Sequence, residues 1–207
     1  MKQTRKSTQV IEPQARAIIF GHGRGWVFTP RDLAHLGNVN SISMALTRLS
    51  RKGIIRQLSR GLYDYPVEHP TLGRIAASAD AVANALASRD ATRLQPAGAY
   101  AANILGLSEQ VPTKILFLTD GPSRHVKLGK REIILKRTTP RNIAAAGRKS
   151  GTIVQALRYL GKNHVDDQVL AIIRRQLTDA DKEQLLKDIK YAPAWVAEIL
   201  RRLAAAS

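Results

Sequence analysis

The chain contains no cysteine, and aromatic residues make up only 5% of its 207 residues. The absence of cysteine excludes disulfides, thiolate metal sites and cysteine nucleophiles, and it fits a reducing cytosol. No apolar run approaches the roughly 18 residues that a membrane span needs. The N-terminal sequence is basic but no apolar run follows it, so it does not predict a secretory signal. These features predict a cytoplasmic protein.

Acidic residues are scarce, with 16 Asp and Glu against 33 Lys and Arg, for a formal net charge of +17. Such an excess favours polyanions, because side chains that neutralise phosphates release condensed counterions. Residues 1–65 carry +8, residues 66–140 carry +4 and residues 141–207 carry +5. Charge alone fits a DNA binder, an RNA binder or a partner of an acidic protein.

Several common motifs of phosphate binding, metal binding and catalysis are missing as well. There is no GxxxxGK[ST] phosphate loop and no GxSxG elbow. The glycine-rich sequence at 21–25 lies between a predicted helix and a predicted strand, the wrong order for a dinucleotide site. The histidines are scattered without metal-ligand spacing; they are His22, His35, His69, His125 and His164. The sequence therefore predicts no enzyme, no cofactor and no metal site.

One catalytic alternative stays open. Asp120 follows an apolar strand, and Glu132 and Lys136 lie on another predicted strand. The three residues loosely resemble the acidic and basic set of a metal-dependent nuclease. Glu132 and Lys136 are four residues apart, however, which is too far for the Glu-x-Lys motif. A loop acid and a surface ion pair are the favoured interpretation.

Residues 26–65 carry the pattern of a winged helix-turn-helix. A helix over Val10–Phe20 precedes them, with Pro13 in its first turn and residues 1–8 as a frayed arm. Its expected apolar face consists of Val10, Ala17, Ile18 and Phe20. The elements that follow are a strand at Trp26–Phe28, a helix at Pro30–Leu36, a second helix ending at Lys52 before Gly53, and wing strands at Ile54–Leu58 and Gly61–Tyr65.

The second helix is the expected DNA reader, because an amphipathic helix fits a major groove about 12 Å wide. Its predicted inner face is Ile42, Ala45, Leu46 and Leu49, and its predicted outer face is Asn40, Ser43, Met44, Thr47 and Arg51. Ser41, Arg48 and Lys52 are expected to flank that outer face. Arg60, at the tip of the wing, is a candidate contact to a phosphate or the minor groove.

The rest of the chain predicts an α+β middle segment over residues 66–140 and an all-helical segment over residues 141–207, packed on the middle one. The middle segment has a predicted helix at Thr71–Arg89 and a mostly antiparallel sheet. Its strands are expected at Arg93–Pro96, Lys114–Thr119, His125–Leu128 and Arg131–Arg137, with a helix at Ala97–Leu105. The C-terminal helices are expected at Ile153–Leu160, Asp167–Gln176, Asp179–Ile189 and Pro193–Leu203, with caps at Asp166, Thr178 and Pro193.

The wing sequence RGLYDYP and the middle segment resemble AbiEi-type antitoxins of type IV toxin–antitoxin, or abortive-infection, systems. The resemblance covers residues 10–205. The matching stretches are Gly61 and Tyr63, Pro96 to Asn103, Leu116 with Thr119 to Gly121, and Ile133 to Lys136. It implies that the winged helix represses its own operon by binding operator DNA. It also implies that the C-terminal part counteracts a nucleotidyltransferase-like toxin.

Two alternatives remain beside this interpretation. Winged helices also serve as protein-interaction modules, and a member without a toxin acts as a stand-alone regulator. A basic cluster on the middle hairpin could extend the DNA footprint, bind RNA or a toxin, or be solvated; it consists of Lys127, Lys130, Arg131, Lys136 and Arg137.

Overall fold

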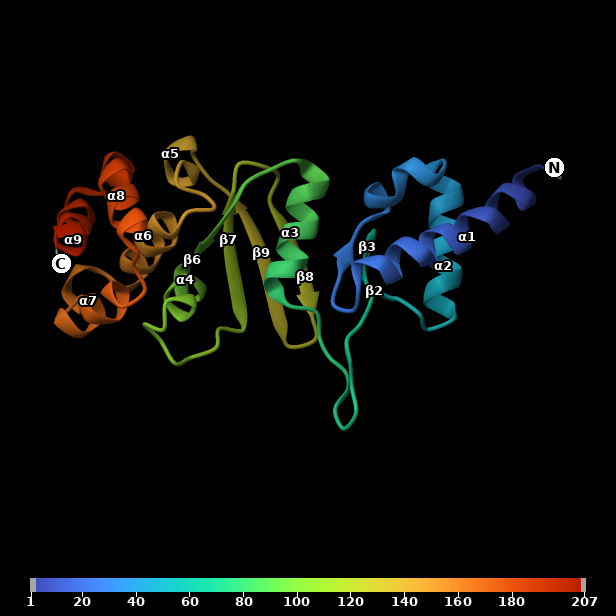
Figure 1. Ribbon diagram of the computed structural model, residues 1–207, viewed down its shortest axis with the longest axis horizontal. Helices are drawn as coiled ribbons and strands as arrows, with labels where there is room; N and C mark the ends of the chain where they lie inside the picture. Colours follow the sequence, from blue (N-terminus) through green and yellow to red (C-terminus); the bar gives the residue numbers. More distant parts are fainter. Residues whose placement is uncertain (1–2, 206–207) are drawn as a thin grey trace. The chain divides into compact units, whose positions relative to one another are not determined.

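The structure is a computed structural model that describes the backbone of residues 3–205 and the side chains of residues 11–205. The chain forms two compact units, Met1–Ala91 (unit 1) and Thr92–Ser207 (unit 2). Figure 1 labels their helices and strands. The predicted α+β class is confirmed. The predicted boundaries after residues 65 and 140 do not separate compact units, because unit 1 continues to residue 91 and the middle sheet shares unit 2 with the C-terminal helices.

Unit 1 is built around two packed helices, α1 (Gln3–His22) and α2 (Val39–Arg51) (Figure 1). Ile11, Ala15 and Ile19 of α1 recur every four residues, so they form one buried stripe on the helix. This stripe meets the buried side chains of α2, which are the predicted Ile42, Ala45, Leu46 and Leu49.

The prediction for the first helix was wrong in its start and its face. The helix begins at Gln3, so most of the expected frayed arm is helical, and Pro13 lies inside it. Ala17 and Phe20 are exposed and Ile18 is only half-buried, because the buried stripe of Ile11, Ala15 and Ile19 lies on another side of the helix. The side chains of residues 1–10, Val10 among them, lie outside the described residues.

A three-stranded sheet completes the winged-helix part of unit 1. Its strands are β1 (Val27–Phe28), β2 (Arg56–Ser59) and β3 (Leu62–Asp64), in the order β1-β3-β2 with antiparallel pairing. The predicted helix at Pro30–Leu36 is present as a 3₁₀ helix, η1. Thr29 and Asp32 form a capping box at its start, with the Asp32 carboxylate accepting from the Thr29 backbone N–H at 2.7 Å.

The predicted helix over Thr71–Arg89 begins late, at Ala79. A short hairpin of β4 (Glu68–His69) and β5 (Gly73–Arg74) occupies the first part, and α3 (Ala79–Asp90) follows. The imidazole Nδ1 of His69 accepts from the backbone N–H of Thr71 and Leu72, which stabilises the turn in place of a helix. Gly73 at φ +68° supplies the left-handed position that a helix does not tolerate.

Unit 2 contains a four-stranded sheet in the order β6-β7-β9-β8. The strands are β6 (Leu94–Ala97), β7 (Lys114–Thr119), β8 (Arg124–Leu128) and β9 (Arg131–Arg137). Only the central pair of β7 and β9 is parallel, so the predicted mostly antiparallel sheet is confirmed. Figure 1 shows these strands side by side.

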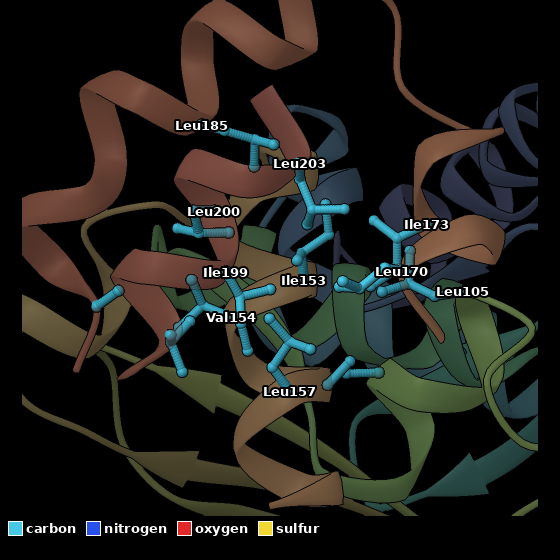
Figure 2. Packing of buried hydrophobic residues seen from close by; sticks show 14 of the residues in the cluster. Leu105, Ile153, Val154, Leu157, Leu170, Ile173, Leu185, Ile199, Leu200 and Leu203 are labelled. Atoms are coloured by element: carbon cyan, nitrogen blue, oxygen red, sulfur yellow. The ribbon is translucent and has the colours of Figure 1, made fainter. Parts of the chain in front are cut away.

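Helices of unit 2 pack beside this sheet and on one another. They are α4 (Gly98–Ile104), α5 (Pro140–Ile143), α6 (Lys149–Leu160), α7 (Asp167–Arg174), α8 (Asp179–Asp188) and α9 (Ala194–Ala205), with 3₁₀ turns at Lys162–His164 and Ile189–Tyr191. The predicted caps Asp166 and Thr178 are present, accepting from the backbone N–H of Val169 and Asp181. In Figure 2, side chains of α6, α7, α8 and α9 converge with Leu105, and Ile153, Leu157 and Leu200 are fully buried among them.

Candidate nucleic-acid interface

Helix α2 is fixed at both ends by local hydrogen bonds. At the start, Asn38 caps the helix, with its side-chain oxygen accepting from the Ser41 N–H at 2.9 Å. At the end, Gly53 at φ +68° donates to the Ser50 carbonyl, and Ile54 donates to the Leu49 carbonyl. These two bonds form a Schellman motif, which satisfies carbonyls that would otherwise lack partners. The helix therefore presents a defined, rigid face.

That outer face contains most of the residues that the sequence predicts. Asn40, Met44, Thr47 and Arg51 are exposed, and Ser43 is half-buried. Met44, at 47% exposure, is a large apolar side chain on a polar helix face. Arg51 has no hydrogen-bond or ion-pair partner within the described part of the chain. An unpaired guanidinium can donate two parallel hydrogen bonds to a phosphate or a guanine edge.

Two predicted residues differ from the expectation. Ser41 is 3% exposed, so the prediction that it flanks the outer face was wrong. The Thr47 hydroxyl donates to the Ser43 carbonyl of its own helix at 2.8 Å. The hydroxyl proton of Thr47 is therefore engaged, and its methyl group and the lone pairs of its hydroxyl oxygen are left for a ligand.

Glu12 of α1 binds the two flanking cations of α2. Its carboxylate forms an ion pair with Lys52 and lies 3.9 Å from Arg48. This contact ties the last turn of α2 to α1 and reduces the charge that Arg48 and Lys52 offer to a ligand. The sequence contains no signal for it, because 40 residues separate Glu12 from Lys52.

The wing is held by a second unpredicted ion pair. Arg56 and Asp64 are paired across β2 and β3, and Asp64 is 1% exposed. The Arg56 guanidinium also donates to the Ile75 carbonyl at 3.0 Å, which connects the wing to the segment after it. Arg60, in the turn between the strands, is exposed and unpaired among the described residues. The contacts of Arg56 therefore stabilise the hairpin whose turn exposes Arg60 to solvent.

The basic cluster of the middle hairpin does not form one patch. Strand alternation puts Arg131 on the side of the buried Ile133 and Leu135, whereas Arg137 ends β9 and lines a hollow together with Lys136. Lys136 falls on the opposite side, together with Lys127, whose register partner on β9 is Glu132. Lys130 lies in the turn between β8 and β9.

The carboxylates of the nuclease alternative do not assemble. In the parallel register of β7 and β9, Lys114 pairs with Glu132, whereas Asp120 follows the far end of β7. Six residues of extended chain separate Asp120 from Lys114, so Asp120 and Glu132 lie about 20 Å apart along the strands. Asp120 instead forms an ion pair with Arg93 at 2.8 Å, and the hydrogen bonds from Arg93 lower the pKa of that carboxyl. Among the described residues, no group of three or more His, Asp or Glu has the arrangement of a metal site.

The positive charge is spread over both units. Unit 1 has 13 basic and 6 acidic side chains, giving +7, and unit 2 has 20 and 10, giving +10. The charge per residue is therefore almost equal in the two units, although the first 65 residues alone have a higher density. Within residues 3–205 no helix is both long enough and apolar enough to cross a membrane.

Comparisons with known proteins identify a family for this chain, but they assign no activity to it. A crystal structure of the RV2827C protein from Mycobacterium tuberculosis is similar with a TM-score of 0.45 and 17% sequence identity, covering 87% of this chain and 72% of that one. The search of curated proteins found no match. A family model described as a family of unknown function, DUF6088, matches residues 14–185. Because that match spans most of both units, the chain belongs to the DUF6088 family.

Proposed function

We propose that unit 1 binds double-stranded DNA, with the outer face of α2 in the major groove and the wing beside it. The observation that carries the proposal is the pair of exposed, unpaired guanidiniums, Arg51 on α2 and Arg60 on the wing. Asn40, Ser43, Met44 and Thr47 supply the short side chains that allow the helix to approach base edges. In this proposal Arg48 and Lys52 contact phosphates at the groove edge only when their ion pairs with Glu12 are broken.

The shape of the reader favours DNA over duplex RNA. A helix enters the wide major groove of B-form DNA, but the major groove of A-form RNA is deep and too narrow for side chains to read. Helix α2 is preorganised by its caps at Asn38 and Gly53. The wing is preorganised by the ion pair of Arg56 with Asp64. A preorganised surface loses little entropy on binding.

In this proposal the protein is a cytoplasmic repressor of its own operon and has no enzymatic activity. Its resemblance to AbiEi-type antitoxins supports a second role, in which the protein counteracts a nucleotidyltransferase-like toxin encoded beside it. The matching stretches at residues 96–103 and 133–136 both lie in unit 2. We therefore assign repression to unit 1 and the antitoxin role to unit 2.

The competing proposal is a winged helix that binds a protein instead of DNA, and exposed Met44 is compatible with it. A mobility-shift titration on DNA from upstream of the protein's own gene separates the two. Sequence-specific retardation that weakens steeply with salt supports DNA binding. Equal, weak retardation of the upstream fragment and of a scrambled fragment favours the interaction module.

A further inference from the structure

Unit 2 contains a basic hollow that the proposed DNA reader does not use. Its volume is about 310 Å³, and it lies where β7 and β9 meet α5 and α6. Pockets for small ligands begin at roughly this size. The floor is apolar, formed by Ala97, Leu116 and Leu118.

The charge of this hollow is uniformly positive. Lys136, Arg137 and Arg158 line it, and no acidic side chain is among the described residues that do so. Lys136 stands opposite Leu118 in the register of β7 and β9, so strand alternation directs its side chain to the same side as the floor. Neither Lys136 nor Arg158 forms an ion pair in the part of the chain that the structure describes. Two unpaired cations beside an apolar floor attract an anion.

The orientation of Arg158 is fixed by a short hydrogen-bond chain. Its guanidinium donates to the side-chain oxygen of Asn142 at 3.0 Å, and the Asn142 amide donates to the Thr138 hydroxyl at 3.1 Å. Because Asn142 is neutral, it positions Arg158 without neutralising the charge. The remaining N–H groups of Arg158 are left for a ligand.

An aromatic ring stands next to this cation. Tyr159 lines the hollow and is 53% exposed, although tyrosine usually buries most of its ring. An exposed ring beside a phosphate-sized basic site is the arrangement on which a nucleobase stacks. We propose that the hollow binds a nucleoside phosphate, with the phosphate on Lys136 and Arg158 and the base on Tyr159. The residues of this site all belong to unit 2, so the proposal does not depend on DNA binding by unit 1.

The test is isothermal titration calorimetry of the full chain with AMP, GMP, CMP and UMP, and with inorganic phosphate and adenosine. We expect at least one nucleotide to bind at least tenfold more tightly than phosphate or adenosine, since only it engages the cations and the ring together. Lys136→Ala and Arg158→Ala should each weaken that nucleotide about tenfold, the effect of losing one charge-assisted hydrogen bond. Tyr159→Ala should reduce its affinity to that of phosphate.

Lys130→Ala is the matched control, because it removes one cation from the same hairpin at the other end of β9. Its nucleotide affinity should equal that of the wild type. A 5′-phosphorylated trinucleotide shows whether the ligand is a free nucleotide or the end of a nucleic-acid strand. If the trinucleotide competes with the same affinity as the mononucleotide, strand ends are ligands. If it competes more weakly, the ligand is a free nucleotide. Absence of saturable binding for all four nucleotides overturns the proposal, as does equal affinity in the wild type, Lys136→Ala and Arg158→Ala.

Discussion

Arg56 and Asp64 stand opposite each other on β2 and β3, and the guanidinium donates to both carboxylate oxygens, at 3.1 and 2.6 Å. Because Asp64 is buried and Arg56 is partly exposed, removing the acid leaves a half-buried cation without its partner. Asp64→Ala should lower the free energy of unfolding by about 2–3 kcal/mol. Urea denaturation measures the change. Asp167→Ala, which removes an exposed partner of Arg202, is the control and should cost less than about 1 kcal/mol.

Arg51 is expected to read a base. If its guanidinium pairs with guanine, Arg51→Ala should cost about 1–3 kcal/mol of operator affinity and relax specificity at one base pair. Binding measured over a library of single-base operator variants shows whether one position loses its preference. Arg175→Ala, on unit 2, removes the same charge and should leave the preference unchanged. A uniform loss at every position would contradict base readout.

Arg60 is expected to act through charge alone. Arg60→Ala should weaken binding to operator and non-operator DNA by the same factor, because a phosphate contact carries no sequence information. The slope of log affinity against log salt should become shallower by about 0.9 for one lost phosphate contact. Titrations at several salt concentrations measure it, and an unchanged slope would remove Arg60 from the interface.

The two proposed roles should separate. Because repression is assigned to unit 1, the double variant Arg51→Ala/Arg60→Ala should derepress a reporter driven by the operon promoter. In co-expression with the nucleotidyltransferase-like toxin of the proposal, the same variant should still restore growth as well as the wild type, at matched protein level. Loss of both activities together would mean that neutralisation depends on DNA binding.

Asp181 makes part of the stability of unit 2 dependent on pH. Its hydrogen bonds with Lys149 and with Thr178 lower its pKa to about 2. Since the folded pKa lies below the unfolded one, the stabilisation is present above about pH 4 and is lost as pH falls towards 2. Asp181→Asn should therefore be less stable at pH 7 by at most about 1 kcal/mol, because water still screens this carboxylate, whose side chain is 24% exposed. Thermal denaturation should show the difference from wild type shrinking between pH 4 and pH 2.

Local signals predicted much of the fold. The apolar period of Ile42, Ala45, Leu46 and Leu49 fixed the inner face of α2, and the glycine at 53 fixed its end. Strand β7 was predicted at its observed bounds because apolar run length and the flanking polar residues agree there. Long-range contacts were not predictable in this way. Ser41 is buried, although the helical period of α2 places it at the flank of the outer face.

In the candidate site, too, local patterns predicted some features and missed those that depend on long-range contacts. Exposure of Asn40, Met44 and Arg51 follows from the helical period, so the sequence was sufficient to predict it. The sequence did not predict the ion pair of Glu12 with Lys52, because no local pattern connects the two residues. The same holds for the hollow lined by Lys136, Arg158 and Tyr159.

DNA binding by unit 1 is tested by the affinity of the full chain for DNA from upstream of its own gene, compared with that of Arg51→Ala/Arg60→Ala. Fluorescence anisotropy at fixed salt gives both values, and Arg175→Ala/Lys130→Ala serves as a control that loses the same charge. If Arg51 and Arg60 contact DNA, the first variant should lose at least about tenfold in affinity and the control should change little. Equal affinities for all three proteins would contradict this proposal.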